Sequence, residues 1–279
     1  MSQTQHSHHP TSESEAANII KRVLSALVLG PLVLVCVWKG EIWFAILIAI
    51  VFVAGGGEWR KLAKLESLRV GTLLILGPLF ILVAIFVAGT TVGLLGLGLA
   101  LLMAIGSIGS TWAERRWAAV ALLHLGCATL ALFVLRQAPD MGRDLVFMLF
   151  GSVWLSDIGG YVAGRLIGGP KLAPRVSPGK TWSGFVGAIT FTVGGAFVFL
   201  AVTKTSNFEL LLLAAVLSLA TQAGDLFESW VKRRFDVKDS GNLIPGHGGV
   251  LDRVDGLLFA APVFALFILT SEWRLSLWQ

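Results

Sequence analysis

The stretch SWVKRRFDVKDSGNLIPGHGGVLDRVD, residues 229–255, gathers lysines, arginines and aspartates around a glycine-rich turn. Apolar segments of membrane-spanning length lie on both sides of it, near residues 208–231 and 249–270. Because charge is costly in hydrocarbon, ionisable groups collected in a membrane protein indicate a functional site. Cations and carboxylates mixed around glycines suit the joint binding of a metal ion and a polyphosphate. The stretch therefore predicts phosphate chemistry at one face of a membrane.

The composition of the whole chain is that of a polytopic membrane protein. Of its 279 residues, 55% are hydrophobic and only 14% are charged, and the mean hydropathy is +0.79. A membrane-spanning helix needs about 20 mostly apolar residues. On that basis the predicted fold class is all-α, with about nine transmembrane helices near residues 23–38, 41–57, 70–89, 91–110, 117–136, 144–164, 182–203, 208–231 and 249–270.

The distribution of positive charge orients these predicted helices. With the N-terminus in the cytoplasm, 17 of the 22 Lys and Arg residues fall on the cytoplasmic side, in agreement with the positive-inside rule. The polar segments 168–184 and 229–255 then both face the cytoplasm. We therefore expect a multi-pass protein of the cell (inner or plasma) membrane with a cytoplasmic site and no nucleic-acid partner.

The pattern of polarity divides the chain into three regions. Residues 1–18 are polar and contain no apolar run, which predicts a disordered cytoplasmic tail. Residues 19–140 form an N-terminal transmembrane region of five predicted helices, whose loops carry no motif. Residues 141–279 hold the other four helices and nearly all of the acidic residues that need an explanation. We therefore expect the catalytic region in this last part.

Acidic pairs recur at helical spacing around the last two predicted spans. Asp225 and Glu228 are three residues apart, as are Asp252 and Asp255, so each pair lies on one face of its helix. Carboxylates from two neighbouring helices can share a divalent cation, and Mg²⁺ takes one or two of them together with substrate phosphates. The alternative is a structural role, in which these carboxylates pair with the arginines of the same stretch.

A further aspartate, Asp157, lies well inside the predicted span 144–164. Two glycines follow it closely, Gly159 and Gly160, and they permit close approach by another backbone or a ligand. Asp157 is therefore a candidate site residue. The alternative is that it pairs with Arg165 and only stabilises the helix bundle.

The polar segment GGPKLAPRVSPGKTWSG, residues 168–184, predicts a second wall of the same site. Ser177 to Thr181 lead into a predicted span, so Thr181 can cap that helix while the free amides of its first turn face an anion. The spacing differs from that of a Walker A loop. A basic loop that meets anionic lipid headgroups is the alternative.

At these residues the sequence resembles the phosphatidate cytidylyltransferases. Their pattern runs Ser-x-apolar-Lys-Arg, Lys-Asp-x-small and His-Gly-Gly-apolar-x-Asp-Arg-apolar-Asp, and this chain matches it throughout residues 229–255. The resemblance extends upstream through Asp225, Lys180 and Asp157, and so covers about residues 150–256. It implies an all-helical membrane enzyme, commonly a homodimer, that depends on Mg²⁺. Its implied substrates are CTP and phosphatidic acid, the latter a membrane lipid.

The resemblance and the residue types together give each candidate a role. We expect Asp225, Asp252 and Glu228 to hold the metal ion, with support from Asp255. We expect five cations to bind phosphate groups: Lys180, Lys232, Arg233, Lys238 and Arg253. His247 is expected to donate to a phosphate oxygen, and its alternative is a turn residue with a satisfied ring. The other substrate-binding candidates are Asp157, Ser177, Thr181, Asp239, Gly248 and Gly249.

Two other functions use similar residue types. A CTP-dependent lipid kinase, which transfers the γ-phosphate to a lipid alcohol, needs the same metal and cations. A transporter for an anionic metabolite lines its pathway with charges, whereas the charges here gather towards one face. The D-G-x-x-A-R run of the CDP-alcohol phosphotransferases is absent from the chain. Labelled CTP separates these functions. The cytidine label enters the lipid in a cytidylyltransferase, the γ-phosphate label enters it in a lipid kinase, and neither enters it in a transporter.

Overall fold

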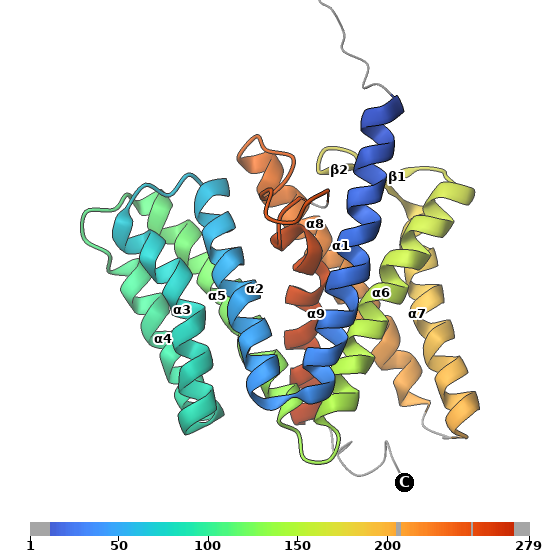
Figure 1. The fold of residues 1–279 in the computed structure, drawn as a ribbon, viewed down its shortest axis with the longest axis horizontal. Helices are drawn as coiled ribbons and strands as arrows, with labels where there is room; N and C mark the ends of the chain where they lie inside the picture. Colours follow the sequence, from blue (N-terminus) through green and yellow to red (C-terminus); the bar gives the residue numbers. More distant parts are fainter. Residues whose placement is uncertain (1–11, 205–207, 247, 271–279) are drawn as a thin grey trace, which may run out of the picture.

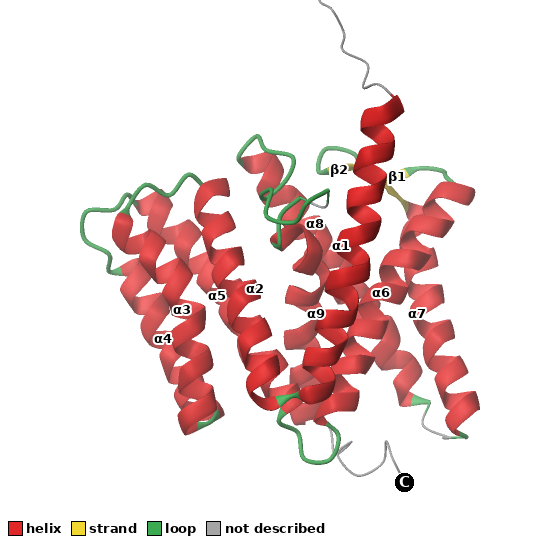
Figure 2. Cartoon of the chain, in the orientation of Figure 1, coloured by secondary structure: helices red, strands yellow, loops and turns green. Residues whose placement is uncertain are grey.

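The computed structural model describes residues 12–204, 208–246 and 248–270, which form nine α-helices and one pair of short strands (Figure 1, Figure 2). In chain order these are α1 (Ser12–Lys39), α2 (Glu41–Leu62), α3 (Leu68–Ala88), α4 (Thr90–Ile105), α5 (Trp112–Arg136), α6 (Gly142–Leu166), β1 (Lys171–Ala173), β2 (Ser177–Thr181), α7 (Trp182–Thr203), α8 (Glu209–Arg234) and α9 (Leu251–Thr270).

Among the described residues, seven helices are long and apolar enough to cross a membrane, namely α2, α3 and α5 to α9. The apolar part of α1, Leu27–Lys39, and helix α4 are shorter. The chain is therefore a multi-pass, mainly helical membrane protein, as the sequence predicts. The count of nine spans stays a prediction.

Helix α1 begins earlier than the sequence analysis predicts. It starts at Ser12, inside the segment 1–18 for which a disordered tail is expected, and residues 1–11 lie outside the described chain. The segment 13–17 is composed mainly of Glu and Ala, which are good helix formers. Intrinsic helix propensity, which a search for apolar runs does not register, accounts for the earlier start.

The polar segment 168–184, for which the sequence predicts no strand, contains β1 and β2. Its two strands pair antiparallel, with Lys171 opposite Thr181 and Ala173 opposite Ser177. A backbone hydrogen bond of 3.1 Å from Val176 to Ala173 closes the turn between them. A pair of such short strands leaves no apolar periodicity in the sequence, so the pattern that identifies helices cannot reveal it.

Helix α5 joins the two halves of the bundle. It packs against α2, α3 and α4 on one side and against α6 and α9 on the other, so α2–α5 and α6–α9 form one continuous assembly (Figure 1). Its start is fixed by a capping box, in which Thr111 accepts from the Glu114 amide and Glu114 accepts from the Thr111 amide. The apolar core runs through both halves.

Close approach of α8 and α9 places their acidic residues side by side. A Cβ added at Gly224 would collide with the carbonyl oxygen of Asp255, and one at Gly256 would lie 2.6 Å from the Thr221 side chain. Only glycine permits this spacing between the two backbones. The carboxylate of Asp225 is thereby brought next to the first turns of α9.

The segments with candidate chemistry lie at one end of the bundle. The β1–β2 hairpin, the connection between α8 and α9, and the C-terminal end of α6 are all at the top in Figure 1. The described N-terminal end of α1 projects from the same end. The fold thus unites the segments 168–184 and 229–255, as the sequence analysis expects.

Candidate active site

Three carboxylates from three helices converge at this end of the bundle. Asp157 comes from α6, Asp225 from α8 and Asp255 from α9. Asp255 lies within electrostatic range of the other two, and Asp157 within range of Asp225. Carboxylates at short range repel one another, most strongly where water is excluded. A cation placed among them would therefore stabilise the cluster.

The structural alternative for Asp157 is not what the fold contains. Arg165 donates from Nη1 to the hydroxyl of Tyr161 at 2.6 Å, and its guanidinium lies 5.8 Å from the centre of the Tyr161 ring. In the described part of the chain no ion pair joins Arg165 to Asp157. Asp157 is instead within electrostatic range of Lys180 and Arg253.

Lys180 brings one cation to the acidic cluster from strand β2. Its Nζ lies 2.6 Å from Oδ2 of Asp225, and about a quarter of the Lys180 side chain is exposed. The other oxygen of Asp225 accepts a 3.4 Å hydrogen bond from Ser229. A partly exposed ion pair of this kind is worth little and exchanges partners at low cost. Lys180 therefore reaches from the hairpin to the acidic cluster.

Lys232 lies at the centre of a second, buried group of charges. Its Nζ is 2.6 Å from Oδ1 of Asp252 and 3.2 Å from Oε1 of Glu228. All three side chains are largely buried. Removal of one member of a buried ion pair costs about 3–5 kcal/mol. This group therefore holds α8 against α9.

Asp252 also fastens the connection between α8 and α9. Its Oδ2 accepts hydrogen bonds from the backbone N of Ser240 at 3.0 Å, from the Ser240 hydroxyl at 3.0 Å and from the backbone N of Gly249 at 2.9 Å. With Lys232 on Oδ1, protein donors occupy both oxygens. The Gly249 amide, a predicted substrate contact, is likewise engaged by Asp252.

A buried carboxylate that the sequence analysis missed, Glu58 of α2, lies beside this group. It is 3% exposed, accepts hydrogen bonds from the backbone N of Val250 and of Leu251, and lies 3.2 Å from the hydroxyl of Ser240. The available signal is a glutamate directly after the predicted span 41–57, in the helix that continues to Leu62, because ionisable residues in membrane helices are functional candidates by default. The N-terminal region thus contributes to the site.

A polar cleft of about 620 Å³ is formed by the connection between α8 and α9 together with Arg253 of α9. Its lining residues are Lys238, Asp239, Asn242, Ile244, Pro245, Gly246, Gly248 and Arg253. Arg253 is also within electrostatic range of Asp157, so it connects the cleft with the acidic cluster. Two cations and the backbone of two glycines in one wall suit an anionic ligand. Predicted residues from the motif therefore do line a cavity together.

Three other predicted residues lie on the hairpin and at its contact with α8. Thr181 caps α7 as predicted, since its hydroxyl accepts from the Gly184 amide at 3.1 Å. Arg233 is exposed and donates from Nε to the carbonyl of Val176 at 3.3 Å, which ties the end of α8 to the hairpin turn. Ser177 begins β2 and is half-buried. His247 lies outside the described residues.

The oxygen donors at this end suit Mg²⁺, although not as a preformed cage. In the part of the chain that the structure describes, no three Asp, Glu, His or Cys side chains form a ready-made metal site. Mg²⁺ commonly binds through one or two carboxylates and completes its shell with water and substrate phosphates. Asp225, with Asp157 and Asp255 close by, meets that requirement. Of the other predicted ligands, Asp252 is saturated by protein donors and Glu228 is buried against Lys232.

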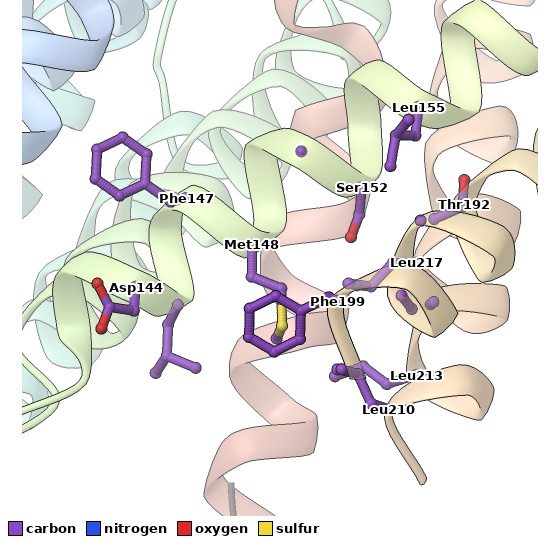
Figure 3. Close-up of a pocket in the computed structure, with 15 residues that line it drawn as sticks. Asp144, Phe147, Met148, Ser152, Leu155, Thr192, Phe199, Leu210, Leu213 and Leu217 are labelled. Carbon is purple, nitrogen blue, oxygen red and sulfur yellow. The ribbon is translucent and has the colours of Figure 1, made fainter. Parts of the chain in front are cut away.

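A second, apolar pocket of about 470 Å³ lies between α6, α7 and α8 (Figure 3). Its lining includes Met148, Phe199, Leu213 and Leu217, with Asp144 at the N-terminal end of α6. No lysine or arginine is among the described residues that line it. Because a triphosphate requires cations, this pocket does not suit a nucleotide, and the polar cleft does.

Comparison with known proteins identifies the family of this chain. Residues 20–271 match the model of the cytidylyltransferase family. The phosphatidate cytidylyltransferase of Brucella suis biovar 1 (strain 1330) is 40% identical over 259 residues, which are 90% of this chain and 93% of that protein. The proteins of the same name from Pseudomonas aeruginosa and Haemophilus influenzae are 35% and 34% identical, over 91% and 88% of this chain and 98% and 97% of their own lengths.

Proposed function

Because the chain belongs to the cytidylyltransferase family and catalyses the phosphatidate cytidylyltransferase reaction, we propose that CTP and phosphatidate meet between the polar cleft and the acidic cluster. The observation that carries this proposal is the position of Arg253. It lines the cleft and also lies within electrostatic range of Asp157. One site thus offers cations for phosphates and carboxylates for a metal ion.

In this reaction a phosphate oxygen of phosphatidate attacks the α-phosphorus of CTP. A new phosphorus–oxygen bond forms, the bond from the α-phosphorus to the α,β-bridging oxygen breaks, and pyrophosphate leaves. The lipid product is CDP-diacylglycerol. Transfers of this kind need in-line positioning of the reacting groups and neutralisation of charge, with little covalent chemistry from the protein.

The chain's own cations meet these needs from two directions. Lys238 and Arg253 hold the triphosphate in the cleft, and exposed Arg233 adds a contact at the rim. Lys180 approaches from the hairpin, where its ion pair with Asp225 is partly exposed, so it can contact a phosphate placed beside that carboxylate. Charge-assisted contacts to phosphate are stronger than neutral hydrogen bonds.

Mg²⁺ is part of this proposal, and Asp225 would be its first protein ligand. Bound there, the ion supplies charge neutralisation on the triphosphate and polarises a phosphoryl oxygen. Asp157 and Asp255 are neighbouring carboxylates within electrostatic range of this site, and their negative charge would favour a cation there. Asp252 and Glu228, which the sequence also proposes as ligands, serve this site through Lys232, because they engage that ammonium.

Labelled CTP tests the reaction and its metal requirement together. Purified full-length protein in detergent, given phosphatidate and Mg²⁺, should transfer the cytidine label to lipid and release the γ-phosphate label as pyrophosphate. We expect EDTA to abolish transfer and an excess of Mg²⁺ to restore it. Entry of the γ-phosphate label into lipid would identify a lipid kinase instead, and full transfer in EDTA would remove the metal from the proposal.

We further propose that the site faces the cytoplasm, across a membrane that the chain crosses nine times. The charge distribution supports this orientation, and so does the shared position of the α1 N-terminal end and the hairpin at one end of the bundle (Figure 1). The location in the inner or plasma membrane belongs to the same proposal. A homodimer is also proposed, on the family resemblance alone.

Thiol labelling tests this orientation. In a variant without Cys36 and Cys127, single cysteines at Ser177 and Leu243 report on the hairpin and on the α8–α9 connection. Leu243 is 59% exposed, whereas Ser240 in the same connection is buried. An impermeant maleimide should label both cysteines in inverted membrane vesicles and neither in intact cells. Labelling of intact cells would show that the site faces the outside.

A further inference from the structure

The carboxylate of Glu58 contacts a distant segment of the chain, residues 240–251, which connects α8 with α9. Its Oε1 accepts from the backbone N of Val250 at 2.9 Å. Its Oε2 accepts from the backbone N of Leu251 at 2.9 Å and lies 3.2 Å from the Ser240 hydroxyl. Glu58 belongs to α2, in the half of the bundle that carries no motif, and is 3% exposed.

We propose that Glu58 is a positioning residue for cytidylyl transfer, which holds the connection 240–251 and, through it, Asp252 and Arg253 in their working positions. This inference rests on the proposed function, because it concerns the same site. Glu58 does not line the polar cleft, so its effect on substrates is indirect.

The start of α9 explains why a carboxylate is needed at this position. The first amides of a helix lack partners within the helix, and they favour an anion together with the helix dipole. Helical bonding in α9 begins with Arg253 N to Val250 O at 3.0 Å, so the amides of Val250 and Leu251 are among these free donors. Glu58 satisfies both, and substrate phosphates must therefore bind elsewhere.

Two glycines let the connection lie directly on the Glu58 carboxylate. A Cβ added at Gly241 would lie 2.5 Å from Glu58 Oε1, and one added at Gly249 would lie 2.6 Å from Glu58 Oε2. Both distances are too short for a real contact, so a larger residue would displace the carboxylate or the backbone. This close fit gives a physical reason for glycine at two positions of the 229–255 stretch.

A continuous buried chain of contacts then leads from Glu58 to Lys232. The Ser240 hydroxyl lies between Glu58 Oε2 at 3.2 Å and Asp252 Oδ2 at 3.0 Å, and Asp252 Oδ1 holds Lys232. A hydroxyl has one hydrogen and can donate to only one carboxylate at a time. A shift of Glu58 therefore changes the bonding of Ser240 and Asp252, and Arg253 follows Asp252 directly in the chain.

The variants Glu58→Gln and Glu58→Asp test this role in the full-length enzyme. Gln keeps the size of the side chain but replaces one carboxylate oxygen with an NH₂ group, which would face the backbone amides that donate to Glu58. We therefore expect kcat/KM for CTP to fall about 10- to 100-fold. Asp keeps the charge on a shorter stem, so the activity of Glu58→Asp should lie between that of Glu58→Gln and that of the parent enzyme. A spin label on a cysteine at exposed Leu243 should become more mobile in Glu58→Gln.

Glu114→Gln is the matched control. Glu114 also accepts from backbone amides of a distant segment, those of Glu66 and Ser67 at 3.0 and 2.9 Å, but in the N-terminal half of the bundle. The Glu114→Gln variant should have a lower melting temperature than the parent enzyme. Well below that temperature, its turnover and the mobility of the spin label should equal those of the parent. Comparison with Glu58→Gln at a temperature where both are folded separates positioning from general stability.

Parent-like turnover and label mobility in Glu58→Gln would overturn the proposal. An activity loss in both Gln variants that only follows their melting temperatures would overturn it as well. Should Glu58→Gln fail to fold, Glu58→Asp carries the same comparison, and parent-like activity there contradicts the proposal. Absence of cytidylyl transfer in the parent enzyme would refute the proposed function instead, whereas the label mobility still tests the contact of Glu58 with the connection.

Discussion

Asp225→Asn should lower the rate of cytidylyl transfer by about 10²- to 10⁴-fold while the protein remains folded. The substitution keeps the size of the side chain but removes the charge that we propose binds Mg²⁺ and that pairs with Lys180. Because this ion pair is partly exposed, its loss should affect stability little. Steady-state kinetics with labelled CTP, together with a thermal melt, measures both effects.

Asp144→Asn serves as the control for Asp225→Asn. Asp144 is also a partly exposed aspartate at the end of a membrane helix, but it lies at the edge of the apolar pocket (Figure 3) and does not line the polar cleft. We expect turnover close to that of the parent enzyme. Near-normal turnover in a folded Asp225→Asn variant would show that Asp225 does not belong to the site.

Lys232→Met should destabilise the folded protein by about 3–5 kcal/mol and abolish activity as a consequence. Lys232 is the ammonium between Asp252 and Glu228, at 2.6 and 3.2 Å, and its removal leaves two buried carboxylates without a counter-charge. Denaturant unfolding in detergent micelles, followed by tryptophan fluorescence, measures the loss of stability. A free energy of unfolding equal to that of the parent would contradict the buried ion pair.

For Arg233, the residue after Lys232, we expect the opposite result: a loss of CTP binding with little loss of stability. Arg233 is exposed and its described hydrogen bonds go to two backbone carbonyls. Arg233→Met should therefore leave stability nearly unchanged but weaken CTP binding about 10- to 100-fold, the value of one charge-assisted phosphate contact. Equal CTP affinity in this variant and the parent would place Arg233 outside the nucleotide site.

Residue types and spacing predict which segments form the site, but not how each charge is used. The motif places Lys232 and Arg233 together as phosphate-binding residues, and their type and spacing do not distinguish one from the other. One step along a helix turns the side chain by about 100°, and here that rotation separates a buried ion pair from an exposed guanidinium. The position of α9 against α8 decides between these roles, and only the tertiary structure contains it.

Contacts between distant parts of the chain are what the sequence could not supply. Thr181 as a helix cap is a local feature, and its prediction is confirmed because the relevant donor is only three residues away. Glu58 acts on residues about 190 positions further along the chain, and no spacing rule covers that separation. The hairpin was missed for a related reason, since its two short strands have no apolar alternation that extends far enough to be recognised.

The most direct test of the acidic cluster as the catalytic metal site uses Mn²⁺ in place of Mg²⁺. Electron paramagnetic resonance of the purified full-length protein, with a CTP analogue that has a methylene group between the α- and β-phosphates, measures how much Mn²⁺ the protein binds. We predict that the parent enzyme and Asp144→Asn bind the ion in the presence of the analogue and that Asp225→Asn does not. Binding of Mn²⁺ by Asp225→Asn with the affinity of the parent enzyme would contradict the account.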